Sequence, residues 1–71
     1  MTYELTNEDK LSIIDQHIRS VDYSLFGAEL DLIEANAVAS PDVPVISGIE
    51  NRIQDLNSRK TALAVERAKL A

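Results

Sequence analysis

The sequence predicts an all-α fold, in which two long amphipathic helices form one antiparallel, coiled-coil-like hairpin domain over residues 1–71. Two observations predict it. Apolar residues recur at alternating spacings of three and four in both halves of the chain, and two prolines stand close together between the halves. The alternating spacing is that of a heptad repeat, which aligns an apolar seam along one face of a helix. A short connection between two such helices makes them antiparallel neighbours.

The first helix is predicted over residues 7–39. Thr6 is placed to cap its first backbone amides, and Glu8 and Asp9 suit the positive end of the helix dipole. Pro41 ends the run, because the residue before a proline is pushed out of helical geometry. The seam of this helix consists of Leu11, Ile14, Ile18, Val21, Leu25, Ala28 and Leu32, continued by Ala35 and Ala39.

A stiff, proline-containing turn is predicted over residues 40–46 and the second helix over residues 47–70. Ser47 and Glu50 have the spacing of a capping box at the start of this helix. A start at Asp42 is the alternative, since a proline is tolerated in the first turn of a helix. The seam of this helix consists of Ile49, Ile53, Leu56, Leu63 and Leu70, with Lys60 and Arg67 at the two remaining seam positions.

The two seams can pair in two registers that differ by one heptad. The predicted register sets Leu25 opposite Leu63 and leaves Leu11 and Ile14 beyond the end of the second helix. A slip by one heptad would cover both residues, but it leaves almost no residues to make the predicted turn. The sequence therefore favours the first register.

Charge is divided unevenly between the two halves. The net charge of −5 comes from twelve acids and seven bases; residues 1–39 hold eight acids and two bases, and residues 47–71 hold three acids and five bases. Opposite charges suit helices that lie side by side. The acidic total argues against nucleic-acid binding, which needs surplus positive charge. The bases of the second helix are expected to pair with the acids of the first: Arg52, Arg59, Lys60, Arg67 and Lys69.

A second apolar stripe follows the same spacing on the first helix, roughly opposite its seam: Tyr23, Phe26, Leu30, Ile33 and Ala37. A helix with one partner needs only one apolar face. A chain of 71 residues also buries little surface and is marginal unless it is stapled or oligomeric. The stripe therefore predicts a homo-oligomer, a four-helix or larger bundle; docking onto a different protein is the alternative.

Catalytic and metal-binding patterns are sparse. His17 is the only histidine, and no candidate ligand stands three or four residues after it. Glu29, Asp31 and Glu34 cluster on the first helix, but the Glu-x-x-His motif of di-iron bundles is absent. The sequence has no nucleophile elbow and no phosphate-binding loop. We expect no enzymatic activity, no metal and no cofactor.

Composition also bears on location and on the turn. The absence of cysteine fits a reducing cytoplasm, the polar start is not that of a signal peptide, and no apolar run approaches the ~20 residues of a membrane span. Val43, Val45 and Ile46 are apolar residues within the predicted turn. They are expected to cap the end of the core, or otherwise to form a docking tip.

Three segments resemble small helical-hairpin proteins encoded by tailed phages of marine cyanobacteria: residues 3–10 (YELTNEDK), 15–18 (DQHI) and 32–37 (LIEANA). The resemblance extends over most of the chain and includes the Ser-Pro pair in its middle. It implies a phage accessory or virion-associated role, in the host cytoplasm or the virion, and carries no active-site residues.

The first functional hypothesis is a non-enzymatic, self-associating structural or assembly module. The second is an acidic inhibitor that binds a host enzyme at a nucleic-acid site through its carboxylates. The third is an RNA-binding dimeric hairpin. Salt separates the first two, because hydrophobic self-association survives ~0.5 M salt, whereas an electrostatic mimic loses its partner.

Overall fold

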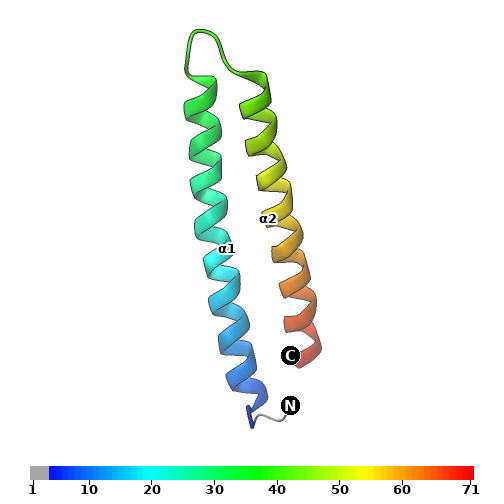
Figure 1. Cartoon of the computed structure of the whole chain (residues 1–71). Helices are drawn as coiled ribbons and strands as arrows, with labels where there is room; N and C mark the ends of the chain where they lie inside the picture. Colours follow the sequence, from blue (N-terminus) through cyan, green and yellow to red (C-terminus); the bar gives the residue numbers. More distant parts are fainter. Residues whose placement is uncertain (1–3) are drawn as a thin grey trace.

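Two helices account for nearly all of the chain. The computed structural model describes residues 4–71, in which helix α1 (Asn7–Asn36) is followed by helix α2 (Val43–Leu70) and no strand occurs. The helices lie side by side and antiparallel, so the start of α1 and the end of α2 lie close to each other, far from the turn (Figure 1). The hairpin measures 55 × 21 × 15 Å. The predicted all-helical hairpin is confirmed.

Helix α1 begins where the sequence predicts. The Thr6 hydroxyl accepts a hydrogen bond from the Asp9 backbone amide at 3.1 Å, and the Asp9 carboxylate accepts one from the Thr6 amide at 3.2 Å. This reciprocal capping box satisfies two of the amides that a helix start leaves without a partner.

Helix α1 ends at Asn36, three residues before the predicted end at Ala39. The Asn36 side-chain amide donates to the Leu32 carbonyl at 3.0 Å, and the amide of the C-cap residue Ala37 donates to the Glu34 carbonyl. Asparagine competes with the helical backbone for hydrogen bonds in this way, which favours a helix end. Ala39 is consequently exposed in the turn and does not extend the seam.

Helix α2 begins at Val43, so the predicted turn over residues 40–46 is wrong and the chain turns over residues 37–42. Asp42 is the N-cap, and its carboxylate accepts a hydrogen bond from the Val45 amide at 3.3 Å. The proline in the first helical turn is harmless, because amides there lack helical partners in any case. Ser47, the predicted cap, lies inside the helix.

Replacing the two candidate caps tests this start. Asp42→Ala should lower the free energy of unfolding by about 1 kcal/mol, the usual effect of removing an N-cap. Ser47→Ala should be neutral or slightly stabilising, because alanine is the better helix former and Ser47 is an exposed helical residue. Urea unfolding followed by circular dichroism measures both changes. A larger loss for Ser47→Ala than for Asp42→Ala would contradict the observed start.

The earlier turn moves the pairing of the helices by about one heptad. Lys60 Nζ lies 2.7 Å from Asp22 Oδ1 and Arg67 Nε lies 2.7 Å from Asp15 Oδ1. Leu25 packs in one cluster with Leu56. The predicted register instead required Leu25 to lie opposite Leu63. The predicted register is therefore wrong, because it depended on a turn placed three to four residues too late in the chain.

The core of the hairpin is small. Its buried residues are Leu25, Ala28 and Leu56, against which Val21 and Ile53 pack. The other residues of the two predicted seams are half-buried, except for Ala39 and Arg67, which are exposed. Ile46 in the first turn of α2 is also half-buried and extends the seam. The chain exposes 5526 Å², whereas a compact monomer of its 7.8 kDa exposes about 4,400 Å². The hairpin thus leaves unusually much surface in contact with solvent.

Candidate protein interface on helix α1

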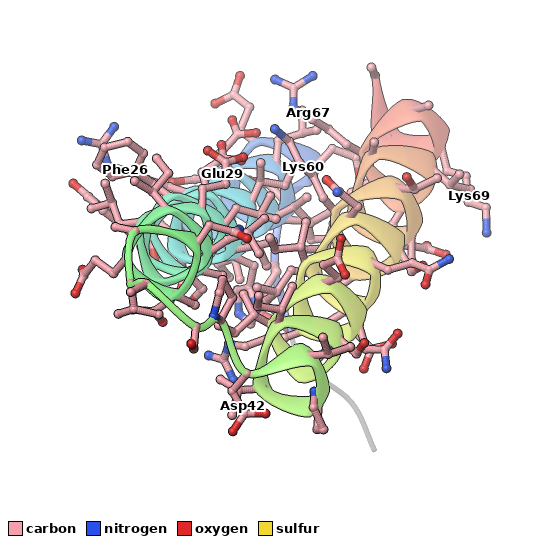
Figure 2. The ribbon with its side chains drawn as sticks, turned by 90° about the horizontal axis from the view of Figure 1, so that it is seen from above. Phe26, Glu29, Asp42, Lys60, Arg67 and Lys69 are labelled. Atoms are coloured by element: carbon pink, nitrogen blue, oxygen red, sulfur yellow. The ribbon has the colours of Figure 1, made fainter. Side chains whose placement is uncertain are left out.

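The outer face of α1 carries four of the large exposed apolar side chains of residues 4–71, including both aromatic ones. We define the outer stripe as Tyr23, Phe26, Leu30, Ile33 and Ala37. Tyr23 is 67%, Phe26 62%, Leu30 41% and Ile33 65% exposed. Seen along the helices, Phe26 points away from α2 (Figure 2). The last member, Ala37, is the C-cap and lies just past the helix.

Arg19 lies one helical turn before Tyr23 and is joined to it. The Arg19 guanidinium donates a hydrogen bond to the Tyr23 hydroxyl at 3.1 Å and lies 5.3 Å from the centre of the ring. The i, i+4 spacing brings such side chains together on a helix surface, and a guanidinium over an aromatic face is attracted to it. This spacing could have revealed the pair in the sequence. The contact places a positive charge at the end of the outer stripe nearest the start of α1.

Two ion pairs between the helices run along one edge of their contact. Lys60 binds Asp22, and Arg67 binds Asp15 through two hydrogen bonds of 2.7 and 3.5 Å. Figure 2 shows Lys60 and Arg67 on the same side of the hairpin as Glu29. The hydrogen bond from Arg67 lowers the pKa of Asp15, and the same bond raises the pKa of Arg67. Because these side chains are about half exposed, the pairs contribute more to register than to stability.

The remaining bases form no continuous cationic surface. Lys69 pairs with Glu66 on its own helix at 3.0 Å. Arg52 and Arg59 line an open groove of about 480 Å³ beside Ser24, and neither has an ion pair within residues 4–71. Of the five bases in the second half, three are therefore engaged by carboxylates. The predicted pairing of opposite charges between the helices occurs at Lys60 and Arg67.

A second apolar surface lies at the end of the hairpin opposite the turn. Leu5, Ile13 and Ile14 line an open groove of about 500 Å³ with Leu63 and Leu70. Leu5 and Ile13 are partly exposed there, and neither belongs to the predicted seam. Their position follows from the observed register, which extends α2 alongside the beginning of α1.

The candidate catalytic and metal-binding residues are not brought together. His17 is exposed, and its side chain has no hydrogen bond or ion pair within residues 4–71. Glu29, Asp31 and Glu34 are also exposed. In the part of the chain that the structure describes, no group of three or more histidine, cysteine or acidic residues is placed to hold a metal ion. Neither of the two described helices has the length and apolar character needed to cross a membrane.

The apolar tip is divided by the earlier start of α2. Ile46 turns into the seam and is half-buried, whereas Val43 and Val45 remain exposed in the first helical turn. Ile46 therefore caps the core, as one of the two readings of the turn expects.

Comparison of the chain with protein-family models, with curated proteins and with solved structures found no match. We therefore infer the function from the surface of the hairpin itself.

Proposed function

We propose that this chain is a non-enzymatic, self-associating structural or assembly module, whose copies join through the outer stripe of α1. The observation that carries the proposal is the exposure of four large apolar side chains in one line on a helix that already has a partner. Contiguous apolar patches of this kind mark interaction sites on soluble proteins. A second copy of the chain supplies a matching apolar surface at the same concentration.

The dimensions of the hairpin support the same proposal. Its three-residue core and its excess of exposed surface leave little burial to stabilise a single chain. Burying the outer stripe between copies would increase the apolar burial that the single hairpin lacks, as it does in helical bundles. The resemblance to cyanophage hairpin proteins supports an accessory or virion-associated role as the biological setting of such a module.

The two other functional hypotheses have less support from the surface. An RNA-binding surface needs free bases, and Lys60, Arg67 and Lys69 are each paired with a carboxylate. An acidic inhibitor would use Glu29, Asp31 and Glu34, which are exposed and free of ion pairs within residues 4–71. That inhibitor hypothesis leaves the outer stripe without a role.

Light scattering coupled to size-exclusion chromatography tests the proposal. We expect a mass of at least twice 7.8 kDa that persists at ~0.5 M salt, because hydrophobic contacts are not screened and the net charge of −5 per chain repels less at high salt. A mass of one chain at every salt and protein concentration would refute it. A single chain that captures a basic enzyme only at low salt would favour the inhibitor.

A further inference from the structure

Gly27 stands in the middle of α1, where glycine is among the least favourable residues. Its backbone does not require glycine, because no residue within 4–71 has a positive φ. A Cβ atom added at Gly27 would meet no atom within 4 Å apart from its chain neighbours and the adjacent backbone of its own helix. Neither the conformation of the helix nor the packing of the hairpin therefore accounts for a glycine at this position.

Gly27 borders the outer stripe. It lies four residues after Tyr23 and three before Leu30, so the three residues share one side of α1. A residue without a side chain in an apolar surface allows the backbone of another helix to approach closely, with the larger neighbours packing around the contact. The space above Gly27 is open in the single hairpin.

We propose that α1 of a second copy crosses α1 at Gly27 in the antiparallel direction, which closes a two-fold symmetric dimer. This inference rests on the proposed self-association and specifies its geometry. In this dimer the same face of each copy is used, so no complementary surface remains for unlimited growth. The two α1 helices lie at the centre of a four-helix assembly, and each α2 lies on the outside.

Charge at the two ends of the outer stripe sets the direction. Arg19 stands eight residues before Gly27 and Glu34 seven residues after it, and Glu34 has no ion pair within residues 4–71. An antiparallel crossing at Gly27 brings Arg19 near Glu34 of the partner subunit, and symmetry repeats the pair. A parallel crossing sets like charges beside each other at both positions. The nearby acids Asp15 and Asp22 are already neutralised by Arg67 and Lys60.

The area of the outer stripe suits a dimer of modest affinity. With full areas of roughly 150 to 250 Å² for each large side chain, the exposed fractions of its four large residues leave on the order of 500 Å² per copy. Two copies then bury about 1,000 Å² in total, which is near the lower limit of specific protein interfaces.

Alanine at each of the two glycines tests the crossing point. Gly48 is a matched control, because it is also helical and exposed and a Cβ there would also meet no atom within 4 Å. Gly27→Ala should raise the dissociation constant about tenfold, since two added methyl groups meet at the crossing. Gly48→Ala should leave it unchanged. Sedimentation equilibrium measures both constants. An unchanged or lower constant for Gly27→Ala overturns the crossing at Gly27.

A charge exchange tests the direction. Arg19→Glu and Glu34→Arg should each weaken the dimer several-fold, and the double variant should recover most of the loss, because it restores opposite charges across the interface. Additive weakening in the double variant overturns the antiparallel direction. Loss of self-association on replacing Phe26 and Ile33, with no effect of Gly27→Ala, would leave the proposed function standing and remove only the crossing.

Discussion

Leu56→Ala is expected to lower the free energy of unfolding by about 2 to 5 kcal/mol, the range for deleting a buried leucine side chain. Leu56 is one of three buried residues within residues 4–71, and it packs with Leu25 and Ala28. Few neighbours can move in to fill the cavity left by the leucine, because only one helix lies on each side of the seam. In a domain of this size the loss corresponds to a fall in Tm of roughly 10 to 30 °C.

Thermal unfolding followed by circular dichroism measures this loss, and Val65→Ala provides the control. Val65 is half-exposed on α2 and outside the core, so its truncation should change stability by less than about 0.5 kcal/mol. Equal losses for Leu56→Ala and Val65→Ala would contradict the observed core.

The same variant also tests the register. Residues in contact show coupling of about 0.5 kcal/mol or more in a double-mutant cycle. Leu56→Ala should couple with Leu25→Ala, because the two side chains pack in one cluster. Leu63→Ala and Leu25→Ala should add independently. Coupling between Leu25 and Leu63 in place of Leu25 and Leu56 would restore the register that the sequence alone favours.

The helices and their seams were predictable because a heptad spacing is a property of the sequence itself. The start of α2 was not, because two valid cap signals stand close together: Asp42 before a proline in the first turn, and Ser47 with Glu50. Local sequence cannot choose between them. The start at Val43 adds Ile46 to the seam, a benefit that appears only when the partner helix is present.

The error in the register follows from that choice. Moving the turn from residues 40–46 to residues 37–42 moves its midpoint by half a heptad. Because the helices run in opposite directions from the turn, the pairing between them changes by a whole heptad. The ion pairs of Lys60 and Arg67 depend on this register, so their acidic partners could not be named before it was known. Charge division between the helices predicted that pairs form, but not which ones.

The outer stripe was predictable as a pattern on the sequence, and the single hairpin leaves it exposed. The proposed partner of the outer stripe could not be identified from its spacing, because a helical period describes a single chain and carries no information about a partner. Gly27 adds that information only after the structure shows that nothing in its own chain lies above it. The close approach that a helical glycine allows is therefore expected between copies.

Phe26→Asp combined with Ile33→Asp is expected to separate the assembly into single chains of 7.8 kDa. Each exchange removes apolar contact of about 1.5 to 3 kcal/mol and leaves a carboxylate without a partner in the interface. The dissociation constant should rise at least about a thousandfold, which corresponds to ~4 kcal/mol. Both side chains are about two-thirds exposed in the single hairpin, so the seam between the helices stays intact, but the separated chains should melt at a lower temperature than the assembly.

Light scattering gives the mass of this variant and circular dichroism its helix content. The matched control is Val45→Asp combined with Val65→Asp, which adds the same charge at two half-exposed valines of α2. The control should keep the mass of the native assembly, because the proposed dimer has α2 on its outside. An unchanged mass for the α1 variant would contradict the proposed interface. Dissociation of both variants would show that the copies also meet through α2, since only then would charge on that helix oppose their contact.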